Sequence, residues 1–146
     1  MKKTFVTLFA ILAIGITVSL ANERKEIDPK IISAFQKEFS FAKNVKWEVK
    51  GDLTQVNFLL NEQGITAWYD ADAVLVTIAR NILYMQLPIS VIKTLETDYA
   101  DASLYGIVEI THNNDTYYRI TGERKNKKFL LEATPSGYIS VFKKIK

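Results

Sequence analysis

Apolar residues recur at every fourth position in two stretches of the chain, and this spacing predicts two amphipathic helices. The first is expected over about Pro29–Phe39 and the second over about Pro88–Tyr99. Asp28 is suited to cap the first helix, because an aspartate just before a helix can accept a backbone hydrogen bond from the first turn. The apolar stripes are Ile31, Phe35 and Phe39 in the first helix and Val91, Leu95 and Tyr99 in the second.

Several short segments follow each helix, and their alternating apolar and polar residues predict β-strands joined by tight turns. In the first segment Trp47 lies on the apolar side, where we expect it to pack against Phe35 or Phe39. The predicted strands are Val45–Val49, Leu53–Leu60, Ile65–Asp70, Val74–Ala79, Leu104–Thr111, Thr116–Gly122, Phe129–Glu132 and Tyr138–Lys143.

Corresponding positions of the two halves are displaced by about 60 residues, which predicts two tandem α-β-β-β-β repeats. One such unit alone would bury little hydrophobic core. We therefore expect a single domain over residues 22–146, made of repeats over about 22–84 and 85–146. Its predicted class is α+β, with one antiparallel sheet and both helices packed on one face of it.

The first 21 residues have the layout of a secretory signal peptide. Lys2 and Lys3 precede an uncharged run from Phe5 to Leu20, which is shorter than the roughly 20 apolar residues that cross a bilayer. Small residues at Ser19 and Ala21 predict cleavage after Ala21. We therefore expect a periplasmic or secreted protein whose mature chain is not embedded in a membrane.

The composition limits the chemistry that the chain can perform. Its 146 residues include no cysteine and a single histidine, so thiol catalysis and multi-histidine metal sites are not available. The formal net charge of +3 falls to +1 when Lys2 and Lys3 leave with the signal peptide, because that segment holds no acid. The basic run Arg124–Lys128 is interpreted as a solvated turn, and no nucleic-acid partner is expected.

Short motifs occur in a characteristic order along the chain. They are Phe35 and Phe39 on the first helix, then Val45-Lys46-Trp47, then Ala67-Trp68-Tyr69-Asp70-Ala71-Asp72, and finally Leu87-Pro88 opening the second helix. This order resembles the exported PepSY-like family, whose fold is similar to that of the beta-lactamase inhibitor protein. The resemblance covers about Ile27 to Phe142 and implies an extracytoplasmic binding or inhibitory module with no catalytic residue. The family turn has glycine where this chain has Ala73, whereas Gly137 stands at the comparable turn of the second half.

Three groups of residues invite a chemical interpretation and lack the partners that it needs. Asp70 and Asp72 could begin a calcium loop, but the next residues supply no further oxygen ligands. Asp98 and Asp101 could form a carboxylate pair, but solvated loop acids are the commoner explanation. His112 stands at a predicted hairpin with no motif that ties a nucleophile to it. We expect no catalytic residue, no metal and no cofactor.

Aromatic and polar residues share the predicted sheet face that points away from the helices. The helix-facing set of positions extends to Val45, Ile139 and Val141, and the opposite set includes Glu109. Tyrosine, tryptophan and arginine among small polar residues are typical of protein-binding surfaces, although the same residues are also common on half-exposed strands. The candidate binding residues are Trp68, Tyr105, Tyr117, Arg119 and Tyr138.

The sequence thus favours an exported, non-enzymatic binding module that engages a protein, a peptide or an envelope component through this aromatic face. A different class of function stays open, in which a cleft between helices and sheet carries a small apolar ligand in the periplasm. A hydrolase is the third class, and no set of residues supports it.

Overall fold

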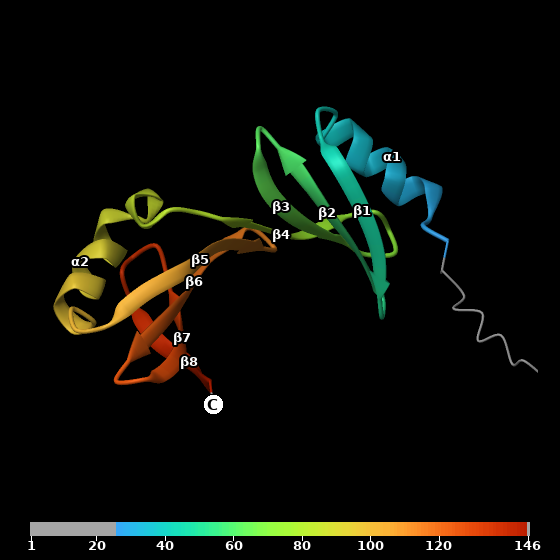
Figure 1. Cartoon of the computed structure of the whole chain (residues 1–146). Coiled ribbons are helices and arrows are strands. Elements are labelled where there is room, and N and C mark those ends of the chain that lie inside the picture. The colour runs from blue at the N-terminus through green and yellow to red at the C-terminus, as the bar shows by residue number, and fades with distance from the viewer. Residues whose placement is uncertain (1–25, 146) are drawn as a thin grey trace, which may run out of the picture.

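The computed structural model describes residues 26–145, which form one open antiparallel sheet of eight strands with two α-helices, an α+β fold (Figure 1). The predicted signal peptide and its cleavage after Ala21 lie outside the described residues. The elements are α1 (Pro29–Glu38), β1 (Lys43–Lys50), β2 (Leu53–Leu60), β3 (Gln63–Tyr69), β4 (Leu75–Asn81), the 3-10 helix η1 (Tyr84–Gln86), α2 (Ile89–Asp98), β5 (Ser103–His112), β6 (Asp115–Arg124), β7 (Lys127–Ala133) and β8 (Ile139–Ile145).

Both helices begin and end within one residue of their predicted bounds. Asp28 caps α1 as predicted, and its carboxylate accepts a hydrogen bond from the backbone N–H of Lys30 at 2.8 Å. α2 begins after Pro88 without a side-chain cap, so its position depends on packing. Neither helix, nor any other among residues 26–145, is long and apolar enough to span a membrane.

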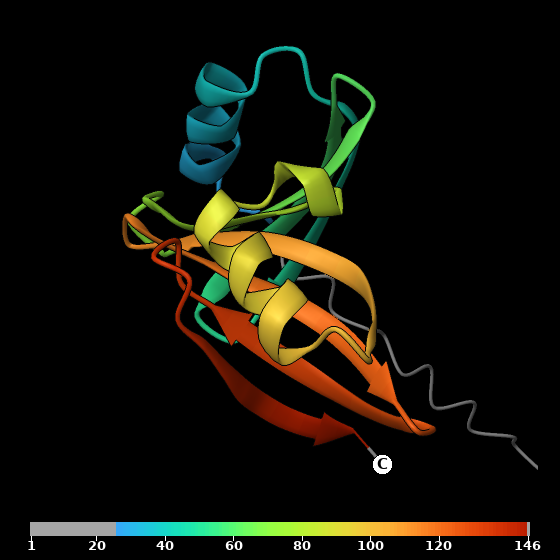
Figure 2. The ribbon, with the colours of Figure 1, turned by 90° about the vertical axis from the view of Figure 1, so that its left-hand side faces the viewer.

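Each strand of the sheet pairs with its neighbours in sequence, in the order β1 to β8. The register places one continuous row of cross-strand partners on the helix side, and this row runs through both halves of the sheet. Both helices therefore lie on the same face, as predicted, with α1 beside β1–β4 and α2 beside β5–β8 (Figures 1 and 2). The row consists of Ile65, Arg80, Glu109, Tyr118 and Ala133.

Two separate hydrophobic clusters hold the helices on this face. The first joins α1 to β2 and β3, and its aromatic rings contact one another at centroid distances of 4.8 to 5.5 Å. Trp47 is among them, 5.1 Å from the Phe35 ring, which confirms its predicted position. The second cluster joins α2 to β5–β7 through residues such as Leu95 and Ile120. Between the clusters Arg80 pairs with Glu109 at 2.6 Å, so an ion pair separates the two cores.

Two residues predicted for the buried side are exposed instead. Val45 is 37% exposed and Val141 is 51% exposed. Val141 does point to the helix side, because it pairs with the fully buried Leu131. It stays exposed because β8 is the last strand of the sheet and has no ninth strand beside it. Val45 lies on the other edge strand, β1, next to a backbone irregularity at Asn44 with a φ of 54°.

Candidate binding face

The face of the sheet opposite the helices, here called the open face, presents side chains from all eight strands. No helix among residues 26–145 covers it, because both pack on the other side. Its side chains follow from the strand register. They include Gln55, Asn57, Thr66, Trp68, Thr77, Ala79, Tyr105, Val108, Ile110, Tyr117, Arg119, Thr121, Leu130, Glu132 and Ser140.

Four of the five candidate binding residues lie on the open face: Trp68, Tyr105, Tyr117 and Arg119. Tyr117 and Arg119 are neighbours on β6. Trp68 is on β3, three strands away, a separation of roughly 14 Å at the usual spacing between strands. The fifth residue, Tyr138, was predicted to begin the last strand. It instead precedes β8 in the turn, where it is 70% exposed.

The structure corrects the prediction that Glu109 belongs to this face. Glu109 pairs with Arg80 and Tyr118, both on the helix side. The cause is a bulge in β5 between Tyr105 and Val108, where Gly106 has a φ of 59°. The extra residue inverts the alternation of the strand, so Tyr105 and Glu109 point to opposite faces.

Arg119 is the centre of a cluster on the second half of the open face. Its guanidinium pairs with Glu132, with Nε at 2.8 Å and an Nη nitrogen at 2.7 Å from the same carboxylate oxygen. It also lies over the ring of Phe142, 3.4 Å from the centroid, and 5.4 Å from the ring of Tyr117. The charge of Arg119 is therefore already paired, and the cluster presents stacked, flat surfaces.

Phe142 is the residue of this cluster that the sequence interpretation missed. It is 52% exposed and comes from β8, the edge strand. Alternation along that strand, with Ser140 on the open face, was the signal that could have found it. Phe142 lies over Arg119, beside the shift of register near Leu130 and Leu131.

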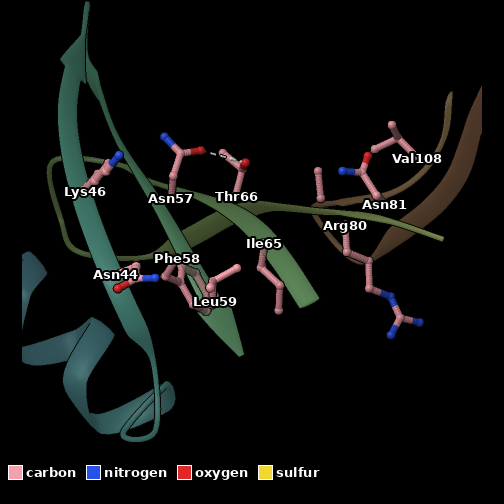
Figure 3. A pocket seen from close by; sticks show the side chains of 12 residues that line it. Asn44, Lys46, Asn57, Phe58, Leu59, Ile65, Thr66, Arg80, Asn81 and Val108 are labelled. Carbon is pink, nitrogen blue, oxygen red and sulfur yellow. Dashed lines mark hydrogen bonds between the residues drawn. The ribbon is translucent and has the colours of Figure 1, made fainter. Parts of the chain in front are cut away.

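The first half of the open face contains a shallow hollow of about 420 Å³ (Figure 3). Asn57, Thr66 and Asn81 point into it, whereas Phe58, Ile65 and Arg80 point to the opposite side of the strands. The Thr66 hydroxyl donates to the Asn57 side-chain oxygen at 2.8 Å, and the Gln55 amide donates to the same oxygen at 3.2 Å. Gly64 leaves the floor open, because no atom lies within 4 Å of the position that its Cβ would take.

Solved structures of Bacteroides proteins resemble this architecture. A BLIP-like protein from Bacteroides fragilis (BLIP stands for beta-lactamase inhibitor protein) gives a TM-score of 0.71 at 22% identity, over 83% of this chain and 89% of that chain. A DUF2874 family protein from Bacteroides uniformis gives 0.73 at 16% identity, over 82% and 89%. A Bacteroides eggerthii protein that is provisionally assigned to the periplasm gives 0.72 at 16% identity, over 82% and 88%. The chain has a BLIP-like fold.

The predicted similarity to the fold of the beta-lactamase inhibitor protein is thus confirmed. No family model and no curated protein matches the sequence, so the likeness concerns the fold alone. Membership of the PepSY-like family stays a prediction.

The other sites that the sequence brought into question have local structural roles within the BLIP-like fold. One carboxylate oxygen of Asp70 accepts hydrogen bonds from the backbone N–H groups of Asp72 and Val74, both at 2.9 Å, and so closes the turn after β3. Asp101 pairs with Arg124. Among residues 26–145 no group of three or more acids or histidines gathers as a metal would require.

His112 lies at the end of β5 on the open face, in the same cross-strand row as Trp68. Its Nδ1 is 2.7 Å from the Thr77 hydroxyl, and its Nε2 is 3.1 Å from the side-chain nitrogen of Asn113. Both ring nitrogens are therefore engaged, and the ring is held in place beside Thr77.

Proposed function

We propose that this protein is an exported, non-enzymatic binding module that engages a protein, peptide or envelope component through its open face. The observation that carries the proposal is the open face itself. It combines the aromatic and cationic cluster around Arg119 with a hollow into which Asn57 and Thr66 point, on one continuous sheet that no described element covers.

The chemistry of the face favours a macromolecular partner over a small substrate. Large aromatic side chains offer contact area at low cost in conformational entropy, and they are enriched at the centres of protein interfaces. The amides of Asn57 and Gln55 and the hydroxyl of Thr66 can pair with backbone groups of a partner. Strands also hold these groups rigidly, so little ordering is needed when the partner binds.

We propose Trp68, Tyr105, Tyr117 and Arg119 as the residues that contact the partner, with Phe142 added to the cluster and Tyr138 at its margin. Because Arg119 is already paired with Glu132, it would contribute a flat stacking surface more than a free charge. Inhibition of an enzyme is one form that such binding would take.

The test compares variants of the tagged mature protein in the cell envelope from which it comes. Trp68→Ala should weaken capture of the partner about 30-fold, which corresponds to about 2 kcal/mol, the usual threshold for a hot spot. Its thermal midpoint should stay nearly unchanged, because Trp68 does not belong to either core. The control is Met85→Ala, which removes an apolar side chain that is 80% exposed from the η1 segment outside the sheet, whereas Trp68 is half-buried.

Equal recovery of the same partner with Trp68→Ala and Met85→Ala would contradict the proposal. A lower thermal midpoint for Trp68→Ala with unchanged capture would contradict it as well, since the side chain would then serve the fold.

Export and domain organisation belong to the same proposal. We propose residues 1–21 as the signal peptide, and residues 22–146 as one PepSY-like domain of two tandem repeats, about 22–84 and 85–146. The mature protein would be periplasmic or secreted. In support, α1 and α2 have equal lengths and each is followed by four strands.

A carrier of a small ligand is the second candidate function. The space under each helix is filled by core side chains, so a ligand would have to bind at the margins of the helix side. One groove of 560 Å³ lies there, beside β7 and β8, and it favours this candidate as developed below.

A further inference from the structure

A groove on the helix side, beyond the C-terminal end of α2, combines an apolar floor with a basic rim. The floor is formed by Tyr99 and Phe129, whose ring centroids are 6.0 Å apart, together with Val141 from β8. Val141 is 51% exposed. We call this site the basic groove; its volume of 560 Å³ is within the usual range for a small-molecule site, about 300–1,000 Å³.

The floor is preformed by a close contact between β6 and β7. Phe129 lies across from Gly122, and a Cβ at Gly122 would come within 2.3 Å of the Phe129 ring. The absent side chain lets the Phe129 ring pack directly against Gly122. The aromatic floor is therefore formed before any ligand arrives.

Cations surround this floor, and most of them have no counter-charge of their own. Arg124 is paired with Asp101 and lies 5.7 Å from the Tyr99 ring. Three further basic residues of the rim are Lys125, Lys127 and Lys144, whereas Lys128 lies across from Glu123 on the open face. Within residues 26–145 no carboxylate forms an ion pair with any of these three ammonium groups. Several unpaired positive charges next to exposed apolar surface make the groove complementary to an anion with a hydrocarbon chain.

From this juxtaposition we infer that the basic groove binds a single-chain anionic amphiphile, with its carboxylate among the rim lysines and its hydrocarbon chain on the Phe129 and Val141 floor. This binding gives the carrier function a specific site, and it is independent of the open face. A peptide fits the groove less well. Apart from the Tyr99 hydroxyl, the side chains that line it are cationic or apolar, so they can donate to oxygens but offer a peptide N–H almost no acceptor.

The test measures laurate binding to the mature protein by isothermal titration calorimetry, below the concentration at which laurate forms micelles. We expect one laurate per chain. Acetate carries the headgroup without the chain, and lauryl maltoside carries the chain without the charge, so each should bind at least about tenfold more weakly.

The rim is tested with the triple variant Lys125→Ala, Lys127→Ala and Lys144→Ala, which should weaken laurate binding about tenfold, since each exposed ion pair contributes a modest amount. The matched control removes as many lysines elsewhere, at Lys37, Lys43 and Lys93, and should change binding by less than about twofold.

The floor is tested with Val141→Asp. This position is 51% exposed, so the fold should tolerate the carboxylate, and circular dichroism with thermal unfolding checks that it does. Laurate binding should be lost, because a negative charge then occupies the path of the chain. Trp68→Ala should leave laurate binding unchanged, which separates this proposal from the one on the open face.

Three results would overturn the inference. They are the absence of laurate binding to the wild-type protein, equal losses in the two triple-lysine variants, and equal affinity for laurate and lauryl maltoside. Tighter binding of a peptide with glutamates around a phenylalanine would also overturn it and assign the groove to a protein partner.

Discussion

The two halves of the sheet have the same order of elements and solve the same packing problem with different side chains. Around α1 the core is aromatic, with Phe35 in contact with the rings of Phe39, Trp47 and Phe58. Around α2 it is mainly aliphatic, with Leu95 and Val91 packed against β5–β7. Both the aromatic and the aliphatic core side chains bury one face of a ten-residue helix against four strands.

On the open face the halves differ in a way that packing does not require. The first half presents the hydrogen-bonded amides and hydroxyl around Asn57, and the second presents the stacked rings around Arg119. On the helix side, the side chains of each half pack against its helix and form its core. The open face is not needed for this packing, so the contrast between the two halves of the open face is better explained by what they contact.

The largest expected effects come from the two cores. Phe35→Ala should lower the free energy of unfolding by about 3–5 kcal/mol, and Leu95→Ala by about 2–5 kcal/mol, because each removes a buried side chain and leaves a cavity. Both tryptophans, Trp47 and Trp68, are in the first half. Their fluorescence during denaturant unfolding should nevertheless report the Leu95→Ala loss, because β4 pairs with β5 and the halves unfold together.

The comparison would break if Leu95→Ala left the tryptophan transition unchanged while the far-ultraviolet circular dichroism signal shifted. The halves would then unfold independently, despite the Arg80–Glu109 ion pair between them. A conservative variant, Leu95→Met, is the control and should cost less than about 1.5 kcal/mol.

A smaller effect should separate two turns that have the same backbone hydrogen bonds. Ala73 donates to the Asp70 carbonyl at 3.1 Å, and Gly137 donates to the Thr134 carbonyl at 2.9 Å. Both have positive φ, 62° and 93°. A Cβ at Gly137 would lie 2.8 Å from the Ser90 carbonyl oxygen, so Gly137→Ala should destabilise the protein by about 2–4 kcal/mol.

The reverse exchange in the first half, Ala73→Gly, should change stability by less than about 1 kcal/mol. It relieves the left-handed backbone of an L-residue, but it also removes a methyl group that packs against the first core and adds chain entropy to the unfolded state. Thermal unfolding of the two single variants measures the difference. Similar losses of stability at both turns would show that the close approach of Gly137 to Ser90 does not affect stability.

The smallest effect concerns alkaline pH and two buried tyrosines. Burial and the neighbouring Glu38 carboxylate raise the pKa of Tyr69 well above the ordinary tyrosine value of 10.0, while burial and Glu109 raise the pKa of Tyr118. The folded state therefore disfavours both tyrosinates. Stability from this source is complete below pH 10.0 and is lost as the pH rises above it, because the unfolded chain deprotonates first.

Urea unfolding at increasing pH tests this linkage. Tyr69→Phe should reduce the alkaline loss more than Tyr118→Phe does, since Tyr69 has the larger pKa shift and its hydroxyl lies 3.5 Å from Glu38. Glu38→Gln, which keeps the ring buried and removes the charge, should have an intermediate effect. An equal slope for all variants would contradict the assignment.

The spacing of apolar residues and the residues at the turns predicted the helices, the strands and the face of Trp47. Each of these features depends on neighbours within a few residues. Errors arose where the backbone departs from regular alternation. The bulge at Gly106 inverted the face of Glu109, whereas regular alternation from Ser140 already puts Phe142 on the open face beside Arg119. The exposure of Val141 depends on its strand being the last in the sheet, which no local pattern encodes. The sequence alone predicts a solvated turn for the basic run Arg124–Lys128, and only the fold places Tyr99 and Val141 beside it.

The strands lie side by side in the sheet in the same order as in the sequence, which is also the order of their synthesis. Every ladder is closed by a hairpin or by the segment that holds α2, so the sheet contains no contact between strands distant in sequence. Such local topology favours fast folding, since every hairpin pair forms after a short turn closes and β5 alone must cross the segment that holds α2 to reach β4. The first half has α1 and all four of its strands once Asn81 has emerged. Its edge at β4 can then act as the template on which the second half is laid down, strand by strand.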